Sequence, residues 1–339
     1  MTVPEGGDIY SDPFTLPVAI TAGQPLLVSL WLENASLSLL PLNSFPSGAM
    51  SWFAPTGTPN ETAVQAGTVF TSGGGYATST VPLLTGLDVT TPAVAGQSPG
   101  EPTVVVTGND GIVDGEANAI PSDAGNAPSQ RLAGQLESQG DASGYGVVDG
   151  SVESNMVLFD GPTQDADTPP GGIALQYRFD HDVLAEPDLG SVIIDVGLQD
   201  VLWLDGDPSS TSLVADAIDD VVQQLVSAQL SAYGGIVVGT LTPCHGYDNA
   251  TITDVCDSQV DVGRTQVNDN LSGLGAICET DFDGALTAAG SSPETLASAY
   301  DDGDHANLTL GASGGYAKLA QEETGCGVAP PLYAAPSTP

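Results

Sequence analysis

The stretch TVVVTGNDGIVDG, residues 103–115, carries the first clear indication of how this chain folds. Its first five residues are all β-branched, which is typical of a strand buried on both faces of a parallel sheet. The glycine-containing remainder is expected to form the loop that follows the strand. Similar runs follow along the chain, at residues 146–149, 191–196 and 235–240.

Helical patterns separate these runs, and the clearest of them spans residues 213–230. Its apolar residues recur at spacings of three and four, while Asp216, Asp219 and Asp220 occupy the opposite side. Strands that alternate with helices predict an α/β fold with helices on both faces of a parallel sheet. Weaker patterns of the same kind predict three further helices, at residues 129–137, 174–184 and 315–322.

The first hundred residues have a different pattern. Short β-prone runs alternate there with turns rich in Pro, Gly, Ser and Thr, and no helical periodicity is present. This pattern predicts a smaller antiparallel β-sandwich domain, with a jelly-roll-like fold. The predicted organisation is therefore a β-rich domain at 1–100, an α/β domain at 101–325 and a Pro- and Ala-rich C-terminal tail at 326–339.

The charge of the chain excludes two classes of partner. The 339 residues include 4 Lys plus Arg and 43 Asp plus Glu, which gives a formal net charge of -39. Nucleic acids and anionic membranes are bound by clustered cationic side chains, so we expect neither as a partner. No apolar stretch approaches the roughly 20 residues of a membrane span. High salt, low pH or a cationic matrix would each accommodate the acidity, and composition leaves all three open.

Cysteines and glycosylation sequons both indicate a secreted, extracellular protein, and the N-terminus is expected to lack a signal peptide. Four clustered cysteines without CxxC spacing predict two disulfides in an oxidising compartment, for which three pairings exist. We favour Cys244 with Cys256, and Cys278 with Cys326. Asn-x-Ser/Thr sequons, which matter only on a secretory route, occur at Asn34, Asn60, Asn249, Asn270 and Asn307.

Four short segments follow predicted strands or lie near the C-terminus, and together they resemble a known family. They are residues 108–115, 149–155, 197–200 and 300–307. In this order they are similar to the sequence blocks of the SGNH, or GDSL-like, esterase and lipase family. The resemblance implies a flavodoxin-like, three-layer sheet of parallel strands and an ester hydrolase that needs no cofactor. Residues 11–18 resemble the β-rich domain of a secreted branch, of which this chain lacks the first strands.

The same resemblance implies that the catalytic centre has lost two of its groups. The family's first block places a Ser nucleophile after an Asp, but here Asp110 precedes Gly111. Its last block places a His base three residues after an Asp, and here Asp304 is followed by Asn307 at that position. An amide does not accept a proton near neutral pH, and losing either group removes nearly all of a triad's rate advantage.

The positions that stabilise the oxyanion in this family are partly kept. Gly197 matches the third block, but Gln199 replaces an Asn side chain and Ser151 replaces a Gly whose backbone N–H is used. Asn155 matches a family Asn. The amide of Gln199 lies on a longer side chain, and a misplacement of about 1 Å can cost on the order of 100-fold in rate.

We therefore expect a secreted, glycosylated, catalytically inactive pseudoenzyme with an extracellular structural or self-assembling role. An exposed edge of the β-rich domain and the tail would join copies into homo-oligomers or filaments. Two alternatives stay open. One is an active esterase for acyl or acetyl esters with a rearranged site, for which Ser151, Ser154 and His305 are candidates. The other is a module that binds carbohydrate in the vestigial cleft.

The remaining polar groups are expected to be structural. Asp301, Asp302 and Asp304 lack EF-hand spacing, so we predict a solvated acidic loop and no metal site. His181 is expected at a helix end or surface, and His245 beside a disulfide. The few cations are each expected in an ion pair, namely Arg131, Arg178, Arg264 and Lys318.

Overall fold

The computed structural model describes most of the chain beyond residue 172 and shorter pieces before it. Described are residues 15, 28, 42–44, 51–53, 76–78, 80–82, 103–108, 132, 146–152, 155–161, 172–228, 230, 235–247, 255–275, 277–301, 308–309 and 313–326. Contacts divide the chain into two units, residues 1–40 with 52–78 and residues 41–51 with 79–339, and each is described by itself. The predicted domain boundaries stay predictions.

Short strands are described within the first hundred residues. β1 (Leu42–Ser44) pairs antiparallel with β4 (Thr80–Pro82), and β2 (Ser51–Phe53) pairs with β3 (Tyr76–Thr78). The antiparallel pair agrees with the predicted strand direction. The rest of the predicted sandwich lies outside the described residues.

The second unit contains a five-stranded parallel sheet. Its strands are β5 (Thr103–Gly108), β6 (Gly146–Asp149), β7 (Leu189–Asp195), β8 (Ile236–Gly239) and β9 (Cys278–Thr280). Their spatial order is β6-β5-β7-β8-β9, and all neighbours are parallel. Counted along the chain this is the order 2-1-3-4-5, which confirms the flavodoxin-like α/β prediction.

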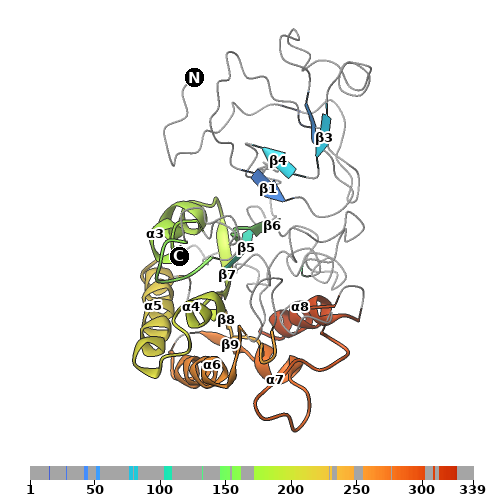
Figure 1. The fold of residues 1–339 in the computed structure, drawn as a ribbon. Helices are drawn as coiled ribbons and strands as arrows, with labels where there is room; N and C mark the ends of the chain where they lie inside the picture. The colour runs from blue at the N-terminus through green and yellow to red at the C-terminus, as the bar shows by residue number, and fades with distance from the viewer. Residues whose placement is uncertain are drawn as a thin grey trace. The chain divides into compact units, whose positions relative to one another are not determined.

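Helices cover both faces of this sheet. Successive side chains of a strand point to opposite faces, and apolar side chains lie on both. Val192 and Ile194 of β7 share one buried cluster with α5 (Pro208–Ser227) and α6 (Ser258–Leu271). Ile193, which lies between them, belongs to a second cluster with Ala320 of α8 (Gly315–Gly325). Figure 1 shows α5 and α6 on one side of β8 and α8 on the other, so the predicted three layers are confirmed.

Shorter helices complete the unit, namely α3 (Leu175–Phe179), the π-helical turn η2 (Asp180–Leu184), α4 (Leu198–Trp203) and α7 (Phe282–Leu286). Of the predicted helix at 129–137 only Leu132 is described, and it is helical. α5 begins five residues before the predicted start because the Asp207 side chain caps it and Pro208 occupies its first turn. Among the described residues, no helix combines the length and hydropathy needed to cross a membrane.

Two disulfides are formed, with the pairing that the sequence favoured. Cys244 bonds to Cys256 in the region after β8, with 5.7 Å between their Cα atoms. Cys278 bonds to Cys326 across 48 residues and therefore joins the start of β9 to the end of α8.

Candidate functional site

The candidate site lies where the chain order of the strands reverses, between the carboxyl ends of β5 and β7. Open α/β sheets bind ligands at this switch point. Gly108 ends β5 with a φ of 145°, and a Cβ at this position would come within 1.8 Å of the Asp195 carbonyl oxygen. Only glycine permits this approach, so the two strand ends converge at this edge.

Ser151 lies just beyond β6 and is bound to the last residue of that strand. Its backbone N–H donates to Oδ1 of Asp149 at 3.0 Å, and its hydroxyl donates to the same oxygen at 2.5 Å. The N–H that the SGNH resemblance assigns to the oxyanion is therefore committed to a carboxylate. The hydroxyl is bound to the same carboxylate, which is a weaker base than the imidazole that usually activates a serine nucleophile.

The Asn155 side chain holds the segment after β6 in place. Its Nδ2 donates to the Ile173 carbonyl at 2.9 Å, and its Oδ1 accepts from Nη2 and Nε of Arg178 at 2.8 and 3.3 Å. Arg178 also donates to the Gly150 carbonyl and to Asp182, both at 2.8 Å. Asn155 therefore has a positioning role here, and the predicted ion pair of Arg178 is confirmed.

The segment after β7 keeps the geometry of a tight turn into a helix. Gly197 is the N-cap of α4 with a φ of 122°, a conformation that favours glycine. Gln199 lies in the first turn of α4 and is half-buried. Within the part of the chain that is described, no hydrogen bond engages its side-chain amide.

Asp200 is a structural residue that sequence reasoning missed. Its two oxygens accept from the backbone N–H groups of Val157 at 2.8 Å and Leu158 at 2.9 Å, which fixes the segment after β6 onto α4. Burial raises the pKa of Asp200 to about 7, although these two hydrogen bonds favour its charged form. The only signal for Asp200 in the sequence was its position three residues after the turn glycine Gly197.

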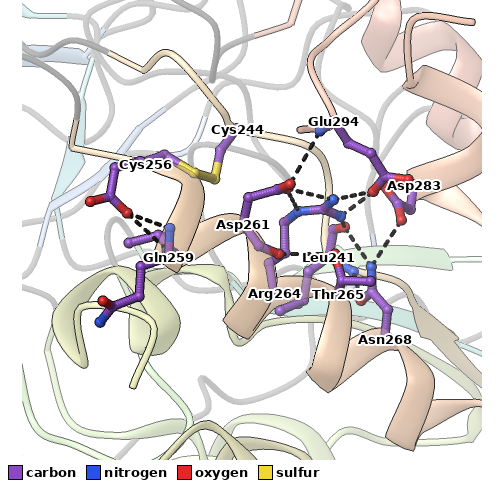
Figure 2. The surroundings of a disulfide bond; sticks show 12 residues. Leu241, Cys244, Cys256, Gln259, Asp261, Arg264, Thr265, Asn268, Asp283 and Glu294 are labelled. Carbon is purple, nitrogen blue, oxygen red and sulfur yellow. Dashed lines mark hydrogen bonds and ion pairs between the residues drawn. A yellow bond between two sulfur atoms is a disulfide. The ribbon is translucent and has the colours of Figure 1, made fainter. Parts of the chain in front are cut away.

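A cluster around the fully buried Arg264 supports the carboxyl end of β8 (Figure 2). We call it the Arg264 cluster: Arg264, the buried Asp261, and the partly exposed Asp283 and Glu294. Oδ1 of Asp261 accepts from Nε and Nη2 of Arg264 at 3.1 and 2.9 Å. Oδ1 of Asp283 accepts from Nη1 at 2.7 Å, and Glu294 accepts from Nη2. Arg264 also donates to the Leu241 carbonyl at 2.9 Å, so the cluster fixes the residue that follows the end of β8.

Asn268 completes this support from the next turn of α6. Its Oδ1 accepts from the Leu241 N–H at 2.7 Å, and its Nδ2 donates to the Leu241 carbonyl and to Asp283. Burial lowers the pKa of Arg264, but the charges of Asp283 and Asp261 outweigh it and leave the pKa raised. The predicted ion pairs are thus confirmed for Arg264, and for Lys318, which pairs with Glu322. Arg131 lies outside the described residues.

Neither described histidine is hydrogen-bonded to Ser151. His181 lies in η2, half-exposed, with Nδ1 2.7 Å from Oδ1 of Asp182, as expected for a helical surface group. His245 follows Cys244 of the first disulfide, as its sequence position requires, and its buried Nδ1 has no hydrogen-bond partner. The described residues contain no group of three or more potential metal ligands.

Several predicted site residues lie outside the described part of the chain, so their predicted roles stay predictions. They are Asp110, Gly111, Ser154, Asp302, Asp304, His305 and Asn307, together with the sequons at Asn34, Asn60 and Asn249. Asp301 forms an antiparallel bridge with Leu308, which joins the two ends of the last block. Asn270 is exposed in the last turn of α6.

No protein-family model and no curated protein sequence matches this chain. Among solved structures, a carbohydrate acetylesterase from Sinorhizobium meliloti is similar over 67% of this chain and 100% of its own, at 11% identity and a TM-score of 0.47. An aryl esterase from M. smegmatis matches 67% of this chain and 99% of its own, at 14% identity and a TM-score of 0.45. A GDSL-like lipase from Bacteroides thetaiotaomicron matches 66% and 87%, at 12% identity and 0.43.

Proposed function

We propose that this protein is a secreted, non-hydrolytic protein with an SGNH-like fold and an extracellular structural or self-assembling role. The observation that carries the proposal is the hydrogen bonding of Ser151. Its N–H donates to Asp149 and is therefore not free to stabilise an oxyanion, and its hydroxyl is bound to the same carboxylate and to no imidazole among the described residues.

The sequence supports the same conclusion at two other positions. Gly111 stands where the resemblance implies the nucleophile and Asn307 where it implies the base. Restoring the rate of a triad requires both groups together, because the members act as one unit. A single substitution elsewhere would not compensate for both losses.

A labelling experiment tests this proposal directly. Purified full-length protein is treated with a fluorophosphonate probe and assayed on p-nitrophenyl acetate, p-nitrophenyl butyrate and acetylated xylan. We expect no labelled serine and no turnover above a heat-denatured control. Turnover or labelling that disappears in Ser151→Ala, Ser154→Ala or His305→Ala would establish the rearranged esterase instead.

A gain-of-function variant sharpens the test. Gly111→Ser combined with Asn307→His restores both implied groups, and each single variant restores one. If the scaffold has lost only its reacting groups, the double variant hydrolyses p-nitrophenyl acetate faster than either single variant. Equal, background rates in all three would assign the loss to the Ser151 N–H as well, and adding Ser151→Gly then tests that assignment.

Secretion is supported by the two disulfides, because such bonds persist in oxidising compartments. The exposure of Asn270 is compatible with a glycan at that sequon. Mass spectrometry of protein isolated from its native source, before and after peptide-N-glycosidase treatment, is expected to find glycans at Asn270 and Asn307. Unmodified peptides at both positions would contradict a glycosylated protein.

The self-assembling role is tested by light scattering across salt concentrations. The net charge of -39 opposes association at low ionic strength, and screening by salt weakens that repulsion. We therefore expect oligomers to grow as salt is raised. A monomer at every salt concentration would leave a soluble binding role, which titration with acetylated and free oligosaccharides then examines.

A further inference from the structure

Two buried carboxyl groups lie on the packed faces of the sheet and α8, and we call them the acid pair: Asp195 and Glu323. Asp195 is the last residue of β7, two positions after Ile193, so both side chains point to the same face. Ile193 packs with Ala320 of α8, and Glu323 follows Ala320 by three residues on the same side of that helix. The two acids are therefore carried by packed elements.

Both members of the acid pair are buried, and no cation among the described residues pairs with them. Asp195 is 6% exposed and Glu323 is 2% exposed. Oε2 of Glu323 is buried without a hydrogen-bond partner. The Lys and Arg side chains that the structure describes are bound by other acids, Arg178 by Asp182, Arg264 by its cluster and Lys318 by Glu322.

Burial acts on the two carboxyl groups in the same direction. It raises the pKa of Asp195 to about 7 and that of Glu323 to about 8, and the nearby charge of Asp195 contributes to the second shift. A buried carboxyl group without a cation avoids the cost of ionisation by keeping its proton. Near neutral pH the acid pair therefore retains protons that exposed acids have lost.

The other titratable groups around α8 do not offset this negative charge. β9 and α7 contact α8 and bring Glu279 and Asp283. Burial raises the pKa of Glu279, and the charge of Asp281 adds to this shift, while Asp283 is bound to Arg264. On α8 itself, Lys318 is paired with Glu322 and Tyr316 is buried. None of these described groups therefore supplies the acid pair with a cation.

We propose that the acid pair is a proton-dependent latch, which holds α8 on the sheet while the pair keeps a proton and loosens α8 when both carboxyl groups ionise. Ionisation would place two unpaired charges in a dry interface, and moving α8 outward is the way to hydrate Glu323. The disulfide from Cys326 to Cys278 keeps the end of α8 attached to β9 throughout. The loosened helix therefore remains next to the sheet and can return when a proton is bound again.

Hydrogen–deuterium exchange of the oxidised full-length protein tests this latch between pH 6 and pH 9, with rates corrected for intrinsic base catalysis. In the wild type, we expect the protection of residues 315–325 to fall by about tenfold or more over this range. Protection of α5, on the other face of the sheet, should change by less than about threefold. Glu323→Gln should remove most of the fall in α8, and Asp195→Asn should reduce it.

The matched control is Asp220→Asn, which removes one exposed acid from α5. It should leave the pH dependence of α8 as in the wild type. Constant protection of α8 in the wild type, or a parallel fall in α8 and α5, would overturn the latch without any variant. An unchanged fall in Glu323→Gln would also overturn it, and if that variant does not fold, the wild-type comparison of α8 with α5 decides.

Discussion

The Arg264 cluster and the acid pair both contain buried carboxyl groups, but only the first contains a cation. Asp261 and Asp283 share the five-donor guanidinium of Arg264. Burial raises the pKa of Asp283, and the charge of Arg264 acts against that shift. Asp195 and Glu323 have no such partner, and burial raises both of their pKa values. The comparison shows two ways in which this very acidic chain accommodates buried acids: a shared cation at Arg264, and raised pKa values at Asp195 and Glu323.

The largest expected effect is that of removing the cation. Arg264→Met would leave Asp261, Asp283 and Glu294 without their shared partner, much like the acid pair. Breaking a buried ion pair by deleting one partner typically costs about 3–5 kcal/mol, and we expect a loss of that size at pH 7 in urea unfolding. The loss should shrink in acid, where the carboxylates can take up protons.

Arg264→Lys serves as the matched variant, because it keeps the charge but not the forked geometry. It should lose less stability than Arg264→Met. A loss below about 1 kcal/mol in Arg264→Met would mean that the cluster is not a stabilising element, since that is the range of an exposed ion pair.

The second effect concerns the acid pair and has the opposite sign. The folded pKa of Glu323, about 8, lies above its ordinary value of 4.5, so its stability contribution is present in acid and is lost as pH rises toward 8. Glu323→Gln has no ionisable carboxyl group at this position, so it does not lose stability in this way. We expect it to be more stable than the wild type at pH 8 by on the order of 2 kcal/mol, with the advantage absent at pH 4.

Thermal unfolding at several pH values measures this difference, with Asp220→Asn as the exposed control. A variant that is less stable than the wild type at pH 8 would show that Glu323 is stabilised as a charged group. The contrast between the two buried groups would then be wrong.

A smaller effect is expected when one acid is removed from the Arg264 cluster. Asp283→Asn keeps an oxygen for Arg264 but loses the charge and disturbs the hydrogen bond from Asn268. Because Asp261 and Glu294 still neutralise Arg264, we expect a loss of about 1 kcal/mol in urea unfolding at pH 7. A loss equal to that of Arg264→Met would show that Asp283 carries most of the cluster's interaction.

The smallest effect is expected at a surface ion pair, which serves as a reference for the buried groups. Lys318 and Glu322 form an ion pair one turn apart on α8, with 26% and 31% of their side chains exposed. Lys318→Met should cost about 0.3–0.5 kcal/mol at low salt and close to nothing in 1 M NaCl, as measured by thermal unfolding. A loss of stability that persists in 1 M NaCl would mean that this ion pair is shielded from solvent in the way that a buried pair is.

Sequence patterns predicted the sheet well because its strands are uninterrupted and β-branched. The strand at Gly146–Asp149 was predicted with both ends correct, and β7 begins two residues before its predicted start. β9 was missed because its three residues include Glu279 and form no apolar run. α6 was missed because its buried side includes Asp261, Arg264 and Asn268, which read as a solvated face.

The candidate site was less predictable, because its hydrogen bonds depend on groups that are distant in the chain. Asp200 accepts from residues 157 and 158, and Arg264 meets acids from three segments. The commitment of the Ser151 N–H is different, since Asp149 is only two residues away and an Asp at this spacing often forms such a turn. The positions of Gly111 and Asn307 in the fold stay predictions.

The link between Cys278 and Cys326 also shapes how the chain responds to proteolysis. Lys318 is the only Lys or Arg between these cysteines, and none follows it. Trypsin acting after Lys318 would free the segment that contains Cys326 only once the disulfide is reduced, because Cys326 keeps that segment bound to β9. On a gel without reductant, the nicked chain would therefore retain its full mass.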